Sequence, residues 1–137
     1  MITEDYVSFE TAKLLKEKGF DGDCYAYWDL TTETKTPKIG LSVSSKNWNY
    51  KWNPIPFPIS APTLQMAMKW LREIHHLIVL IRTGRKSEES SGHRFWFSIE
   101  NEDMKELTDR KHQYDYCADA YEQACEDAIK YCLEHLI

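Results

Sequence analysis

The sequence predicts an α+β fold in which helices pack on a small, mostly antiparallel sheet of four strands. The predicted order is α-β-β-α-β-β-α, an α/β/α sandwich-like arrangement. Two observations predict it. In residues 59–82 a helical pattern passes directly into a strand pattern, and elsewhere helical and strand periods alternate with short connections. The chain has 137 residues, of which 42% are hydrophobic, so we expect one domain over 1–137. Within it, 1–58 would precede a helix-hairpin-helix core over 59–137.

The segment 59–82 organises this prediction. Ser60 is the expected N-cap of a helix over 60–75, because Pro62 is tolerated in a first turn. Residues 77–81 form a continuous apolar run, which is typical of a strand buried on both faces. The helix has one apolar face and a second apolar row beside it: Leu64, Ala67, Met68, Leu71 and His75, then Met66, Trp70 and Ile74.

A first helix is predicted over 8–18, with Ser8 as its N-cap. Gly19 has the place of a left-handed C′ residue. Phe20 would then fold back on Leu15, which is the hydrophobic contact of a Schellman motif.

A β-hairpin is predicted from 24–30 and 38–44. In the second strand Ile39, Leu41 and Val43 alternate with Gly40 and Ser42. This alternation indicates a half-buried strand with the three branched residues inside.

The segment 45–58 is expected to be irregular, because proline at alternate positions from 54 to 58 excludes a helix and a central strand. Trp48, Tyr50 and Trp52 also alternate there. They form either an exposed aromatic surface for a partner or anchors that hold a long connection on the domain.

The residue pattern in the second half of the sequence predicts another hairpin and a last helix. A polar loop over 83–92 leads into a strand over 93–100, with Phe95, Phe97 and Ile99 on one face. We expect a helical turn around 104–107, a short edge strand at 114–116, and a helix over 119–136. Asp119 and Glu122 have the spacing of a capping box.

The composition and charge argue against some classes of function. Residues 101–137 carry a net charge of −6 within a total of −5, which argues against a nucleic-acid binder with a broad basic face. We expect no membrane span, no export signal and cytoplasmic residence. The four cysteines are interpreted as reduced core residues: Cys24, Cys117, Cys125 and Cys132.

We expect no metal and no cofactor. Phosphate-loop, nucleophile-elbow and paired-cysteine motifs do not occur in the sequence. His75 and His76 are adjacent, so in a helix their rings would point about 100° apart and could not easily chelate one ion. Cys125 and Cys132 share a helix face, but that face offers no third or fourth ligand.

Several segments resemble the phage ABA-sandwich domain, from residue 58 to residue 137. They are Ile-Ser-Ala-Pro-Thr at 59–63, Met-Ala-Met-Lys-Trp-Leu at 66–71, Phe-Trp-Phe at 95–97 and Ala-Tyr-Glu-Gln-Ala-Cys-Glu-Asp-Ala-Ile at 120–129. The segment 9–20, together with 69–73, is similar to small prophage and mobile-element proteins of gut bacteria. The resemblance implies layered α/β/α architecture and a phage context, and it assigns no site residues.

Two classes of function remain open. One is a non-enzymatic accessory protein that binds another protein, of the mobile element or of its host, through the tryptophan-proline loop or a sheet edge. The other is an enzyme or small-molecule binder with a pocket between the sheet and residues 48–58. The candidate binding residues are Trp48, Tyr50, Trp52, His93 and Arg94. The sequence predicts no oligomeric state.

Overall fold

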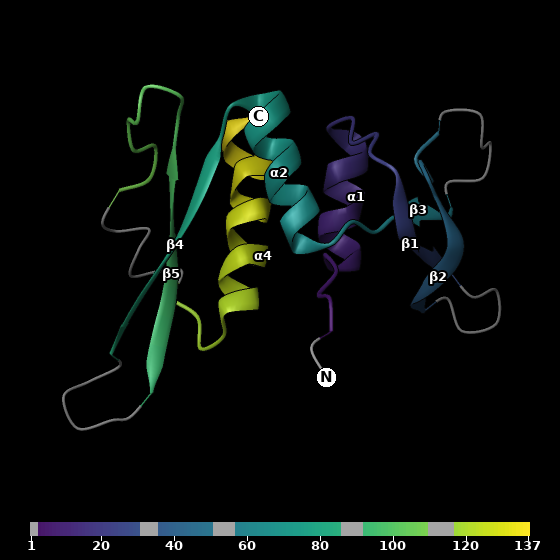
Figure 1. Ribbon diagram of the computed structural model, residues 1–137, viewed down its shortest axis with the longest axis horizontal. Coiled ribbons are helices and arrows are strands. Elements are labelled where there is room, and N and C mark those ends of the chain that lie inside the picture. The colour runs from purple at the N-terminus through teal and green to yellow at the C-terminus, as the bar shows by residue number, and fades with distance from the viewer. Residues whose placement is uncertain (1–2, 31–35, 51–56, 86–91, 110–116) are drawn as a thin grey trace. The chain divides into compact units, whose positions relative to one another are not determined.

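The computed structural model describes residues 3–30, 36–50, 57–85, 92–109 and 117–137. They form a mixed α+β fold with two antiparallel sheets (Figure 1). The chain divides into two compact units, residues 1–67 and 68–137. The expectation of one domain over 1–137 stays a prediction.

Helix α1 (Phe9–Glu17) has the ends that the sequence predicts. The Ser8 hydroxyl accepts a hydrogen bond from the Thr11 amide at 3.2 Å, so Ser8 is the N-cap. Gly19 has φ of 91°, and the Phe20 amide donates to the Leu15 carbonyl at 2.9 Å. With the Gly19 amide bonded to the Lys16 carbonyl, this is the predicted Schellman motif.

The first sheet has the strand order β2-β1-β3. The predicted hairpin is confirmed as β1 (Cys24–Leu30) and β2 (Pro37–Lys46), which pair antiparallel. The sequence did not predict β3 (Ile59–Ser60), which pairs with β1 through Tyr27 and Trp28. Ser60 therefore lies in a strand rather than at a helix N-cap.

Helix α2 (Leu64–His75) begins later than predicted, because Thr63 rather than Ser60 caps it. The Thr63 hydroxyl accepts from the Met66 amide at 3.1 Å. In the second apolar row only Trp70 is buried, whereas Met66 and Ile74 are exposed.

The first unit has its core where α1 packs on β1 and β3. The Trp28 indole lies edge-on to Phe9, with ring centres 6.0 Å apart, and its Nε1 donates to the Val7 carbonyl at 3.0 Å. Figure 1 shows α1 beside β1. The buried apolar residues of this unit include Val7, Ala12, Leu15, Phe20, Cys24, Ala26 and Ile59.

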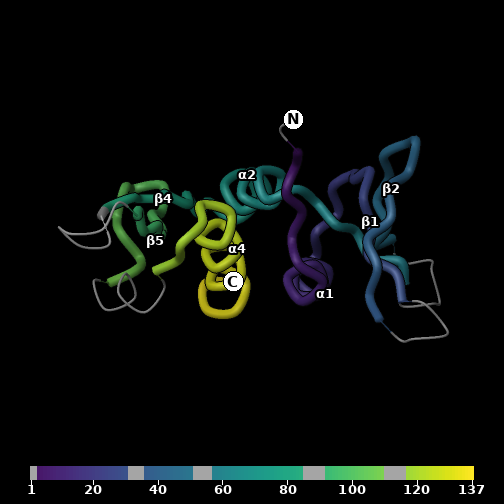
Figure 2. The backbone as a smooth tube through the Cα atoms, turned by 90° about the horizontal axis from the view of Figure 1, so that it is seen from below, coloured from purple at the N-terminus to yellow at the C-terminus, as the bar shows by residue number. Residues whose placement is uncertain are grey.

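In the second unit β4 (Ile78–Arg85) and β5 (His93–Glu100) form the second predicted hairpin. Phe97 and Ile99 are buried on the face that packs on α4 (Tyr121–Tyr131), and the rings of Phe97 and Tyr131 lie 5.6 Å apart. Figure 2 shows α4 along one side of this hairpin. Phe95 contacts Tyr121 at the other end of the helix.

Two predictions about the strands were wrong. The four predicted strands do not form one sheet, because in the described residues the two hairpins belong to separate sheets. The strand predicted over 77–81 is not buried on both faces. Residues 78–81 are only half-buried, and β4 pairs with β5 alone among the described strands.

The C-terminal helix also differs from the prediction. It begins at Tyr121, and its N-cap residue is Ala120 rather than the predicted Asp119. After Tyr131 the helix continues as the π-helical segment η1 (Cys132–Leu136).

Residues 101–108 form a turn rather than the predicted helical turn at 104–107. Met104 has φ of 61°, and the Asn101 side-chain oxygen accepts from the Lys105 amide at 3.0 Å. The chain then returns along β5, where the Leu107 amide donates to the Ile99 carbonyl. The predicted strand at 114–116 lies outside the described residues. Among the described helices, none is long and apolar enough to cross a membrane.

The cysteines are free thiols, and three of them are buried as predicted. Cys117 is exposed, so for this residue the core assignment was wrong. Burial raises the pKa of Cys132 to about 12 and that of Cys24 to about 11, the latter despite the opposing Ser60 hydrogen bond. Burial also raises the pKa of Cys125.

We therefore expect Cys117 to react rapidly with a thiol reagent under native conditions, while Cys24, Cys125 and Cys132 react only on unfolding. A native titration of thiols at pH 8 measures this. In the control variant Cys117→Ser the rapid phase should disappear. Rapid labelling of Cys125 or Cys132 would contradict the assigned burial.

Candidate functional site

The edge strand β2 carries a row of apolar side chains that remain exposed. Ile39 is 42% exposed, Leu41 is 68% exposed and Val43 is fully exposed. The sequence predicted a half-buried strand with these three side chains inside. That prediction was wrong, because all three are exposed. We call Ile39, Leu41 and Val43 the β2 row.

The position of β2 in the sheet explains this exposure. Ile39 lies opposite Trp28, and Leu41 lies opposite the fully buried Ala26, so these pairs share a face of the sheet. A helix about 10 Å wide covers roughly two strands spaced about 4.8 Å apart. Helix α1 contacts β3 and Trp28 of β1, and the β2 row extends one strand beyond that core.

The other face of the hairpin is covered by aromatic rings. Tyr27 lies over Gly40, where any Cβ would collide with its ring. The Trp48 indole packs on Tyr27 with ring centres 4.4 Å apart, and the Lys46 ammonium lies 4.1 Å from the Trp48 ring centre. The two faces of β2 therefore differ where it pairs regularly with β1, and Ile39 and Leu41 present branched apolar side chains on the face opposite the rings.

Trp48 has the geometry of an anchor. Its Nε1 donates to the Cys24 carbonyl at 2.9 Å, and its backbone amide donates to the Ser60 hydroxyl at 2.9 Å. Beside it, Asn49 donates to the Phe20 carbonyl at 3.1 Å and accepts from the Ser60 amide at 3.0 Å. These bonds hold the residues that follow β2 against β1 and β3.

The residues predicted as a binding surface do not come together in one unit. Trp48 and Tyr50 belong to the first unit, and Tyr50 is 59% exposed. His93 and Arg94 lie on β5 of the second unit, where both are exposed. Trp52 lies outside the described residues.

The β2 row was not nominated from sequence. Its alternation was visible, but alternation does not tell which side of a strand the core lies on. The informative signal was the lysine at each end of the run, Lys38 and Lys46, because lysine is typical of edge strands.

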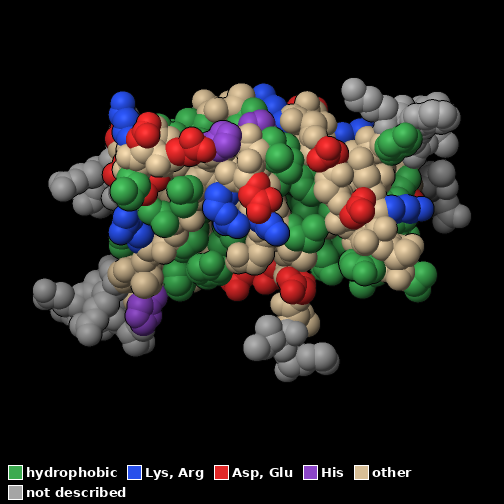
Figure 3. All heavy atoms as spheres, turned by 45° about the horizontal axis from the view of Figure 1, so that its top comes forward, with side chains coloured by type: hydrophobic (Ala, Val, Ile, Leu, Met, Phe, Trp, Pro, Cys, Tyr) green, Lys and Arg blue, Asp and Glu red, His purple; other side chains and the backbone are tan. Residues whose placement is uncertain are grey.

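Hydrophobic side chains reach the surface in the part of the molecule that holds β1 and β2 (Figure 3). Tyr25 of β1 is also exposed, at the position where the β1–β2 register shifts. Exposed apolar side chains that are contiguous mark interaction surfaces more often than isolated ones do.

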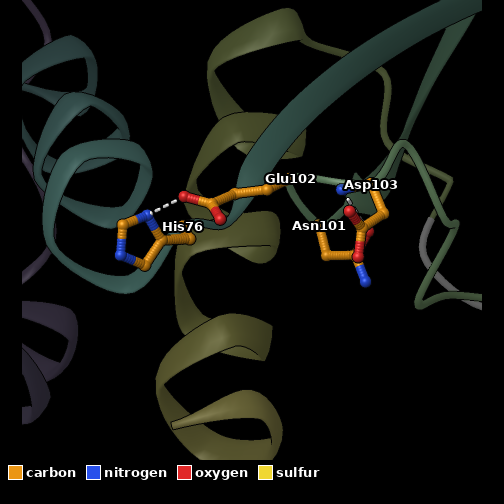
Figure 4. A network of polar contacts seen from close by, with 4 residues as sticks. All are labelled: His76, Asn101, Glu102 and Asp103. Atoms are coloured by element: carbon orange, nitrogen blue, oxygen red, sulfur yellow. Dashed lines mark hydrogen bonds and ion pairs between the residues drawn. The ribbon is translucent and has the colours of Figure 1, made fainter.

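A second polar cluster lies where α2 ends. His76 leaves the helix with φ of 58°, and its Nδ1 forms an ion pair with Glu102, which follows β5 (Figure 4). Both side chains are exposed, so solvent screens the pair. Next to Glu102, the Asn101 side-chain oxygen accepts hydrogen bonds from the backbone amides of Asp103 and Lys105, both at 3.0 Å.

His75 points elsewhere. Its ring packs edge-on to Trp70 at 4.5 Å, and its buried Nε2 has no hydrogen-bond partner among the described residues. Burial lowers the pKa of His75, and the neighbouring His76 adds to this. In the described part of the chain no group of three or more His, Cys, Asp or Glu side chains could hold a metal ion.

No family model, curated protein or solved structure matches the chain.

If Trp48 is an anchor, Trp48→Ala should lower the free energy of unfolding by about 3–5 kcal/mol, because it removes a large packed ring and a hydrogen bond. Tyr50→Ala, at an exposed position nearby, should change it by only about 0.5 kcal/mol. Urea denaturation followed by circular dichroism measures both. Equal stability of Trp48→Ala and the parent protein would exclude the anchor.

Proposed function

We propose that this protein is a non-enzymatic interaction module that binds an extended segment of another protein along β2. The observation that carries the proposal is the exposed β2 row on a strand that pairs, among the described strands, with β1 alone.

The physical basis is strand addition to a sheet edge. An edge strand presents unpaired backbone N–H and C=O groups, and an extended partner can satisfy them. Alternate side chains of the partner then lie beside those of the edge strand. The β2 row would supply that apolar contact at Ile39, Leu41 and Val43.

The backbone of residues 37–41 is already extended before a partner binds. The β1–β2 pairing holds 37–41 extended, and the Trp48 anchor fixes the chain that leaves β2. Most of the conformational entropy lost on binding would therefore be lost by the partner strand.

The resemblance to the phage ABA-sandwich domain supports an accessory role in a prophage or mobile element, with a protein of the element or its host as the partner. The layered α/β/α arrangement implied by that resemblance is part of this proposal. The alternative of a pocket beside residues 48–58 stays a prediction.

A random peptide library displayed on phage and selected against the immobilised protein tests the proposal. We expect the selected peptides to alternate apolar and polar residues. Their binding should fall at least tenfold with Leu41→Lys, because the ammonium group interrupts the apolar row.

The matched control is Ile74→Lys, which places the same charge at another exposed apolar position, on α2. It should leave peptide binding unchanged. Both variants should melt within a few degrees of the parent protein, since both positions are exposed. Equal binding of the selected peptides to the parent protein and to Leu41→Lys would refute β2 as the site.

A further inference from the structure

The charges along β2 have one sign. Lys38 and Lys46 stand at its two ends, and the strand carries no acidic residue between them. Lys38 forms no ion pair with any described residue, and Lys46 contacts the Trp48 ring without a described carboxylate partner. Neither ammonium group is therefore paired with a carboxylate of the described residues.

The nearest acidic residue along the neighbouring strand forms no ion pair with Lys38. Asp29 of β1 lies opposite Lys38, and its Oδ1 accepts a hydrogen bond from the Leu30 amide at 2.9 Å. Asp29 is also on the inner side of the pair, whereas a partner strand would approach β2 from its outer edge.

We infer, on the basis of the proposed function, that β2 takes an extended peptide segment with apolar residues at alternate positions and a carboxylate near each end. The apolar side chains would cover the β2 row. The carboxylates would lie beside Lys38 and Lys46, where opposite charges on neighbouring strands attract.

A second copy of this chain fits β2 less well. Antiparallel pairing of two β2 strands would bring the Lys38 end of one copy beside the Lys46 end of the other. Like charges on neighbouring strands are destabilising. Charge complementarity therefore favours an acidic segment of a different protein.

Two synthetic peptides test the inference, each with blocked termini and a fluorescent label. One is Glu-Val-Thr-Val-Thr-Val-Thr-Val-Glu, and the other has lysine in place of both glutamates. Fluorescence anisotropy at low salt measures their affinity for the parent protein and for the double variant Lys38→Glu/Lys46→Glu. Thermal melting establishes that the variant is folded.

We expect the parent protein to bind the glutamate peptide about tenfold more tightly than the lysine peptide, since each exposed pair contributes at most a few-fold. The double variant should reverse the preference. High salt should reduce the preference in both proteins.

The outcomes separate the inference from the proposed function. Equal binding of both peptides, weakened by Leu41→Lys, would overturn the acidic partner and leave β2 as a binding edge. Binding of neither peptide would count against the proposed function as well. A dimer in sedimentation experiments that Leu41→Lys dissociates would make a second copy the occupant and overturn the acidic segment.

Discussion

The first unit depends on β1 having neighbours on both of its edges. Residues Tyr27 and Trp28 pair with β2 on one side and with β3 on the other. The Ala61 amide donates to the Ala26 carbonyl at 3.0 Å and extends the contact with β3. Because β1 is central, α1 packs on β3 and on Trp28 of β1, and β2 remains the outer strand. The exposure of the β2 row follows from that order rather than from any property of its residues.

The ends of α1 were predictable from sequence, and strand β3 was not. The Ser8 cap and the Gly19 termination of α1 depend on residues within a few positions, so their chemistry is readable. Strand β3 has only two residues and is fixed by β1 more than 30 positions earlier. The Ser60 hydroxyl could have capped a helix, but it accepts from the Trp48 amide instead. For the site, the sequence indicated the alternation in β2 and left Trp48 as either a binding surface or an anchor, and it did not indicate the exposed side of the strand.

The first half of β2 differs from an edge built only to resist aggregation. Protected edges place a lysine or proline within the strand, or a bulge that bends it away. In β2 the lysines stand at the ends, and the register shift falls after Leu41, since Leu41 pairs with Ala26 and Lys46 pairs with Cys24. The segment from Ile39 to Leu41 keeps regular pairing without a charged residue. This arrangement limits unspecific pairing beyond Leu41 and leaves the segment from Ile39 to Leu41 able to accept a strand.

Backbone hydrogen exchange tests most directly whether the outer edge of β2 is open. In an antiparallel edge strand the amides alternate between those bonded to the neighbour and those facing solvent. The account predicts that the amides of Lys38, Ile39, Gly40 and Leu41 exchange alternately fast and slowly in the isolated protein, while those of Ala26, Tyr27 and Trp28 are all slow. Uniformly slow exchange across these β2 amides would mean that another strand already occupies the edge, and would contradict the account.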